Sequence, residues 1–204
     1  MNDKLLNSNT VCLADNEIKT MYLFVKTETS GLIPKWAQVT DLDNLPRMVQ
    51  IAWILTDDDG NKIVTQDHII KPENYKIPFN ASMIHGITTE RAMYEGLDLS
   101  DVLHSLNELI DEADYIVAHN MSFHEKIIGS EFLKSNIETE FFNKRKICTM
   151  KSSTDYCQLS GPLGFKYPKL SELYSFLFNQ PFEETQNIEA IKQCFWELRS
   201  LSII

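Results

Sequence analysis

A lysine and a glutamate stand two positions apart at the end of an apolar run, at Lys26 and Glu28. Side chains at i and i+2 of a β-strand project from the same face, so this ammonium and this carboxylate can form an ion pair. Two carboxylates at the same spacing would suit Mg²⁺, which prefers oxygen ligands. The lysine instead repels a metal ion and leaves the pair nearly neutral. The spacing therefore predicts charge pairing at this point.

Two further side chains have metal-binding chemistry in principle. His124 carries an imidazole, a borderline ligand that suits zinc better than Mg²⁺. Asn187 stands at the start of an apolar stripe with helical spacing and offers a neutral carbonyl, a poorer Mg²⁺ ligand than a carboxylate. We expect no bound metal, and if one binds, Glu28 and His124 are the candidate ligands.

The elements that position these residues follow from the apolar pattern. Short apolar runs predict strands, stripes with a spacing of three and four predict helices, and the acidic turn Asp57–Asn61 predicts a hairpin. The predicted fold is α/β, with a mixed five-stranded sheet (an antiparallel meander plus parallel strands) flanked by helices. Residues 1–19 are expected to form a tail or edge segment and residues 20–204 one domain. The predicted strands are Met21–Val25, Met48–Leu55, Lys62–Ile70, Tyr115–Ala118 and Lys146–Met150, and the predicted helices cover residues 101–113, 122–134, 169–178 and 188–198.

Four segments along the chain resemble the ordered motifs of one enzyme family. They are residues 22–32 (YLFVKTETSGL), 84–90 (IHGITTE), 116–124 (IVAHNMSFH) and 187–198 (NIEAIKQCFWEL). These segments are similar to motifs of the DnaQ-like 3′–5′ exonucleases, which have a ribonuclease-H-like fold, and the resemblance runs from about Met21 to Leu198. It implies an activity in which acidic side chains hold two divalent ions at a phosphodiester and a histidine acts as general base.

The chain departs from this pattern at most of the positions that the resemblance makes catalytic. Lys26 replaces the first acid, Glu28 retains the second, His124 replaces the third and Asn187 the fourth. The general-base position falls on Gln186 if a short deletion is assumed, or on Phe182 without a gap. One substitution in such a site does not compensate for another, so we expect hydrolysis to be absent or negligible.

The resemblance leaves two functions open. The first is a non-catalytic module without a cofactor, which binds single-stranded nucleic acid or a protein partner. The alternative is a weak 3′–5′ exonuclease on single-stranded DNA or RNA ends, using Mg²⁺ or Mn²⁺ with Glu28, His124 and either Glu184 or Glu189. The candidate residues of the substrate cleft are Thr29, Ser30, His85, His119 and Asn120.

Composition bears on the choice of partner. The formal net charge of −10 disfavours tight nucleic-acid binding in the absence of metals. One cluster of basic residues with aromatic neighbours could form a stacking and phosphate surface or an ordinary solvated rim. No apolar run is long enough to cross a bilayer and no secretory signal is recognisable, so we expect a cytoplasmic protein without membrane contact. The basic cluster comprises Lys144, Arg145, Lys146, Lys151, Lys166 and Lys169, next to Phe165 and Tyr167.

Overall fold

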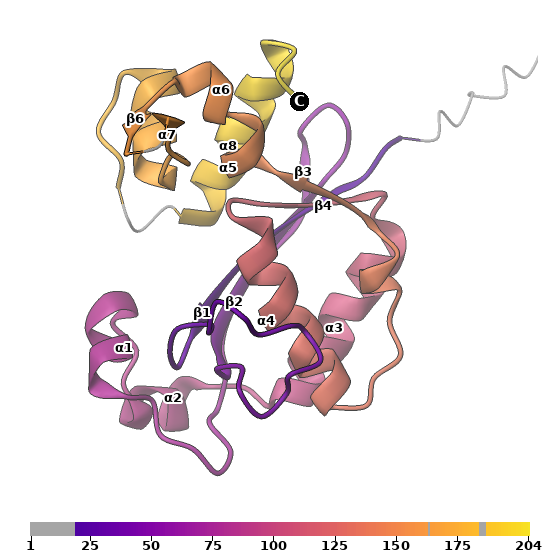
Figure 1. The fold of residues 1–204 in the computed structure, drawn as a ribbon. Helices are drawn as coiled ribbons and strands as arrows, with labels where there is room; N and C mark the ends of the chain where they lie inside the picture. The colour runs from indigo at the N-terminus through magenta and orange to yellow at the C-terminus, as the bar shows by residue number, and fades with distance from the viewer. Residues whose placement is uncertain (1–18, 163, 184–186) are drawn as a thin grey trace, which may run out of the picture.

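The computed structural model describes residues 19–162, 164–183 and 187–204 (Figure 1). Its main sheet has five strands in the order β3-β2-β1-β4-β5. The first three strands pair antiparallel, and β4 and β5 continue the sheet parallel to β1. The predicted fold class is confirmed. The strands are β1 (Tyr22–Thr29), β2 (Met48–Thr56), β3 (Lys62–Ile69), β4 (Tyr115–Ala118) and β5 (Arg145–Cys148).

Alternate side chains of β1 enter two different cores. Leu23 and Val25 pack against helices α3 (Leu99–Glu112) and α4 (Met121–Lys134) on one face of the sheet. Tyr22 and Phe24 pack on the other face against α8 (Asn187–Ser200). This alternation follows from the period of two in a strand. Lys26 and Glu28 continue the Tyr22–Phe24 series and therefore lie on the α8 face.

Two short helices follow β3 and close one end of the sheet, where Figure 1 shows them beside the ends of β1 and β2. Helix α1 (Phe79–His85) ends at Gly86, whose φ of 73° is a left-handed conformation that glycine adopts without strain. Helix α2 (Thr89–Glu95) begins after Thr88, whose hydroxyl accepts the N–H of Arg91. The segment at residues 84–90 is thus the junction between two helices.

The region after β5 differs most from the sequence-based prediction. The predicted strand Lys146–Met150 stops at Cys148, because Thr149 already begins a helix. Further short elements of this region were not predicted, since pieces of two to four residues carry no apolar period. They are α5 (Thr149–Ser152), α6 (Thr154–Cys157) and the small hairpin β6 (Ser160–Gly161) and β7 (Gly164–Phe165), which precede α7 (Leu170–Phe178). The 3₁₀ helix η1 (Glu140–Phe142), which lies before β5, was not predicted either.

The predicted hairpin turn between β2 and β3 is confirmed. Asp57 accepts hydrogen bonds from the backbone N–H groups of Asp59 and Asn61, and Gly60 has a φ of 80°. The turn packs against α8, where an added Cβ at Gly60 would lie 3.2 Å from the Trp196 ring. Among the described helices, none combines the length and apolarity needed to cross a bilayer.

Candidate functional site

Lys26 and Glu28 form an ion pair on the α8 face of β1. Their side chains are 20% and 26% exposed, so the pair lies in a recess rather than in the core. The recess is a cleft of about 480 Å³ between the sheet, α1 and the start of α8. Other side chains that line it are Gln50, Asp67, Met83, Ile84, His85 and Ile188.

His124 is buried beneath the opposite side of β1, and both of its ring nitrogens bond to protein atoms. Nδ1 lies 3.1 Å from the backbone nitrogen of Thr27 and 2.9 Å from its Oγ1, and Nε2 lies 3.0 Å from the carbonyl oxygen of His119. Because the Thr27 N–H donates to Nδ1, the ring hydrogen is on Nε2, which donates to His119. Burial, with a contribution from the charge of Lys26, lowers the pKa of His124 to about 3. The ring is therefore neutral and has no free lone pair.

Sheet geometry explains this position of His124. Strand β4 pairs with β1 only from Tyr22 to Phe24, so the backbone of Thr27 has no β4 partner. The chain leaves β4 through Asn120, whose φ of 65° is a left-handed conformation that asparagine tolerates. Helix α4 then brings His124 alongside the open edge of β1, where the imidazole takes the place of a strand partner. His124 thus fastens α4 to β1.

His119 has a comparable structural environment. Its Nδ1 lies 3.0 Å from Thr149 Oγ1 and its Nε2 lies 2.9 Å from the carbonyl oxygen of Pro168. Burial lowers the pKa of His119 to about 4, so this ring is also neutral at pH 7. It connects the end of β4 to α5 and to the segment that leads into α7.

The remaining cleft candidates divide into two groups. The Ser30 hydroxyl accepts the N–H of Arg47 at 2.9 Å, which closes the loop after β1. Thr29 and His85 line a second hollow of about 280 Å³ that adjoins the cleft and shares Glu28, Ile84 and His85 with it. Ser30, His119 and Asn120 are not among the described residues that line either hollow. The apolar lining of this second hollow was not predicted from the sequence; it consists of Leu32, Ala81, Ile84 and Phe123.

His85 is the least satisfied of these side chains. Its Nδ1 accepts the N–H of Ile87 at 3.2 Å, which leaves the ring hydrogen on Nε2. That Nε2 is buried and makes no hydrogen bond of ordinary geometry among the described residues, although the backbone of Thr29 lies close enough to offset part of the effect of burial on the pKa of His85. Burial lowers the pKa of His85, so the side chain presents a neutral N–H donor.

The last predicted site segment is only partly described. Gln186 and Glu184 lie outside the described residues, and Asn187 is the first residue of α8, with a side chain that is not described either. Glu189 pairs with Lys62 at 2.7 Å and with Lys192 at 3.1 Å. Phe182, the other position for a general base, packs edge-on against Tyr174 with ring centroids 5.8 Å apart. Neither Glu189 nor Phe182 is placed as a free catalytic group.

Residues 23–180 match the exonuclease family represented by RNase T. The chain belongs to this exonuclease family. Among solved structures it is similar to E. coli exonuclease I in complex with a dA16 oligonucleotide, with 18% identity, a TM-score of 0.71, and coverage of 89% of this chain and 41% of that one. An exonuclease I complex with SSB-Ct matches with 17% identity, a TM-score of 0.71 and the same coverage. At this identity the likeness shows the fold. No curated protein matches the chain.

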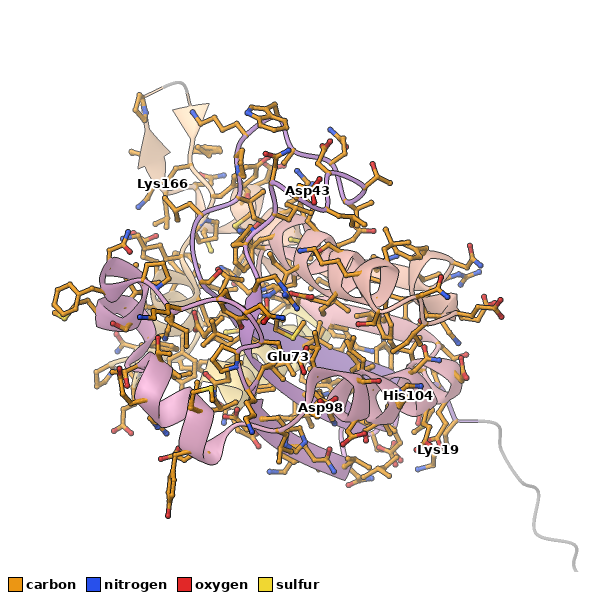
Figure 2. The ribbon with its side chains drawn as sticks, turned by 90° about the horizontal axis from the view of Figure 1, so that it is seen from below. Lys19, Asp43, Glu73, Asp98, His104 and Lys166 are labelled. Atoms are coloured by element: carbon orange, nitrogen blue, oxygen red, sulfur yellow. The ribbon has the colours of Figure 1, made fainter. Side chains whose placement is uncertain are left out.

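The basic cluster of this exonuclease-family chain is divided in space. Lys144 and Arg145 line a hollow with Thr20, near the start of the described chain. Lys166 lies on the small hairpin, and Figure 2 shows it on the opposite side of the molecule from Lys19. Lys166 also pairs with Glu172 at 2.5 Å. Lys166 therefore lies apart from Lys144 and Arg145.

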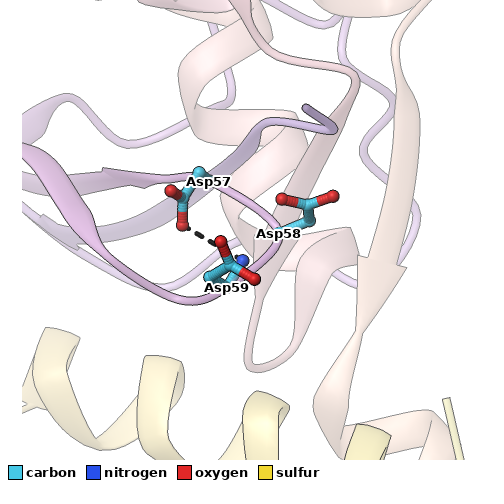
Figure 3. A group of neighbouring side chains, drawn as sticks. All are labelled: Asp57, Asp58 and Asp59. Atoms are coloured by element: carbon cyan, nitrogen blue, oxygen red, sulfur yellow. Dashed lines mark hydrogen bonds between the residues drawn. The ribbon is translucent and has the colours of Figure 1, made fainter. Parts of the chain in front are cut away.

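An acidic group in the β2–β3 turn also has the composition of a cation site (Figure 3). Carboxylate oxygens of Asp57, Asp58 and Asp59 lie within 4.8 Å of one another. Lys19 lies 3.1 Å from Asp57 and 2.5 Å from Asp59 and supplies positive charge there. A hydrogen bond from the Asn61 side chain, with others from its backbone and from Lys19, lowers the pKa of Asp57 to about 2. Turn chemistry and the lysine account for this arrangement.

Proposed function

We propose that this member of the exonuclease family is a non-catalytic binding module whose former metal site is replaced by an ion pair. The observation that carries the proposal is the contact between Lys26 and Glu28 in the cleft. By the resemblance, Lys26 stands where the family has its first acidic ligand. An ammonium at that point neutralises the one retained acid and repels divalent ions.

The described donor groups do not fit a pair of Mg²⁺ ions, which require several oxygen ligands. Glu28 is paired with Lys26, and both nitrogens of His124 are bonded within the protein. Glu189 is paired with two lysines. Asp67 is exposed and lies at the cleft, but its carboxylate accepts a 2.5 Å hydrogen bond from Gln50. No hydrolytic step through metal ions is therefore assigned to this chain.

Both classes of partner fit a non-catalytic module of this fold. The similar exonuclease I structures contain an oligonucleotide in one case and SSB-Ct in another. We propose single-stranded nucleic acid or a protein as the partner of this chain, without a cofactor and in the cytoplasm. The charge and the apolar character of the residues that line the cleft and the adjoining hollow distinguish these two classes of partner.

Metal binding and nuclease activity test the proposal together. Purified protein is heated with and without Mn²⁺, and end-labelled single-stranded DNA and RNA are incubated with Mg²⁺ or Mn²⁺. We expect no shift of the melting temperature and no trimming of 3′ ends, because a ligand raises the melting temperature only if it binds the native state.

Lys26→Asp is the matched control. It recreates two carboxylates at i and i+2 on one strand face, so Mn²⁺ should raise its melting temperature by a few degrees, roughly the effect of 1 kcal/mol in a protein of this size. Trimming by the wild-type protein that disappears in Glu28→Ala would contradict the proposal and establish the metal-dependent exonuclease.

A further inference from the structure

We propose that the groove formed by the cleft and the adjoining hollow binds a peptide segment of another protein, in which an apolar side chain lies close to a lysine or arginine. This inference rests on the proposed function, since a groove that held metal ions would have a different charge. Three properties of the lining support it: an apolar shelf, a hydrogen-bond donor without a hydrogen bond of ordinary geometry, and a net negative charge.

The apolar shelf consists of α1 and the loop after β1. Phe79, Met83 and Ile84 are 79%, 70% and 77% exposed, and Ala81 is the only buried residue of this seven-residue helix. Leu32, which is 87% exposed, lines the smaller hollow together with Ile84. Met83 and Ile84 line the cleft, whereas Phe79, four residues before Met83 on the same side of the helix, is exposed but lines neither hollow. Clustered exposure of large apolar side chains is typical of a protein-interaction surface.

The donor is His85 Nε2, at the boundary between the two hollows, which has the Thr29 backbone nearby but no hydrogen bond of ordinary geometry. Buried polar groups in folded proteins almost always have a hydrogen-bond partner. A peptide offers a carbonyl oxygen at every residue and can supply this acceptor while its side chain rests on the shelf. An apolar small molecule would leave the donor unsatisfied.

Charge decides between a peptide and a polyanion. The charged residues that line the cleft are Lys26, Glu28 and Asp67, which together carry one net negative charge, and the whole chain carries −10. Without metal ions, a phosphate backbone would face these carboxylates with a single paired ammonium to attract it. A guanidinium or ammonium group would instead be attracted to exposed Asp67. The lining therefore favours a cationic peptide over single-stranded nucleic acid.

The test uses fluorescent decapeptides with one Leu or Phe and one Arg, separated by one to four residues, in a neutral Gly/Ser background. Binding is followed by fluorescence anisotropy in EDTA, with the same peptides carrying Glu in place of Arg, and with dT12 and U12 oligonucleotides. We expect at least one Arg peptide to bind saturably, its Glu counterpart to bind at least about tenfold more weakly, and neither oligonucleotide to displace it.

Substitutions at exposed positions locate the binding surface without threatening the fold. Ile84→Ser and Asp67→Asn should each weaken the Arg peptide about fivefold to tenfold. Phe176→Ser is the matched control, because Phe176 is a 48% exposed aromatic residue on α7 and does not line the groove. Its affinity should equal that of the wild type.

Two results would overturn the inference: no peptide of the set binds, or an oligonucleotide binds more tightly than every peptide and loses affinity in Lys26→Glu. The nuclease assay tests the proposed function independently of the peptide-binding experiment. If a peptide binds and the protein also trims 3′ ends with metal, only the non-catalytic proposal is contradicted. If no peptide binds and no trimming occurs, only the inference about the peptide is contradicted.

Discussion

The groove around Glu28 and the junction between α4 and β2 each contain a glutamate paired with a cation, but the two carboxylates differ in how fully the protein satisfies them. Glu131 of α4 is fully buried and accepts the Arg47 Nε–H at 3.0 and 3.2 Å and the Met48 N–H at 2.9 Å. Glu28 is partly exposed and paired with one flexible ammonium. The junction is a fixed structural connection, whereas the groove retains groups that can exchange partners.

The largest effect should come from Glu131→Gln. The neutral amide removes the counter-charge of Arg47 and replaces one of the two acceptor oxygens with an NH2 donor. Breaking a buried ion pair in this way destabilises a protein by about 3–5 kcal/mol. Urea denaturation followed by circular dichroism measures this change. The comparison between the two regions would fail if Glu131→Gln and Glu28→Gln had equal effects.

His124→Ala should come next in size. It removes the partner of the Thr27 N–H and of the His119 carbonyl, and an unsatisfied buried group costs about 1–3 kcal/mol. We expect a loss of at least about 2 kcal/mol in the free energy of unfolding. The control is His104→Ala on the exposed side of α3, which should change stability by less than about 0.5 kcal/mol. An unaffected His124→Ala protein would show that the imidazole does not fasten α4 to β1.

Acidification should weaken the hydrogen bonds through which His124 connects α4 to β1. Folded-state pKa values of about 3 for His124 and about 4 for His119 lie below the ordinary value of 6.5, so the unfolded chain takes up protons first. Their contribution is complete above pH 6.5 and declines as the pH falls from 6.5 toward 4 and 3. Stability should drop by at least about 1 kcal/mol between pH 7 and pH 5.

Urea denaturation at several pH values measures this dependence, and His124→Phe should reduce its slope. A wild-type protein that is equally stable at pH 7 and pH 5 would contradict the assignment of both rings as buried and neutral.

The smallest effect is expected for Glu28→Gln. A partly exposed ion pair contributes about 0–1 kcal/mol, so the free energy of unfolding should change by less than about 1 kcal/mol. In the same variant the net charge of the cleft lining becomes zero, and an Arg peptide should bind more weakly. A loss of stability comparable to that of Glu131→Gln would show that the ion pair of Lys26 and Glu28 stabilises the fold.

The sequence predicted the sheet more completely than the segment after it. The strands from Tyr22 to Ile69 are long enough to appear as apolar runs, and the turn at Asp57–Asn61 predicted the pairing of β2 with β3. The hairpin of Ser160–Gly161 and Gly164–Phe165 has two residues in each strand and leaves no such signal.

The candidate site was predictable to the extent that its residues are neighbours in sequence. The contact of Lys26 with Glu28 follows from their spacing on a strand. The bond between His124 and Thr27 joins residues 97 positions apart, and no local pattern indicates it. The exposure of Ile84 was equally hidden, because an apolar residue in a short helix is ordinarily expected to pack inward.

The sequence alone determined the order of the longer strands and helices, the sharing of one face of β1 by Lys26 and Glu28, and the acidity of the chain. All of these depend on residue type and on spacing along one strand or helix. The tertiary structure decided that His124 is enclosed by the backbone, that His85 Nε2 lacks a hydrogen bond of ordinary geometry, and that Met83 and Ile84 of α1 line the groove. These features depend on tertiary contacts between segments that are distant in the sequence, because such contacts decide which groups are buried and which hydrogen bonds form.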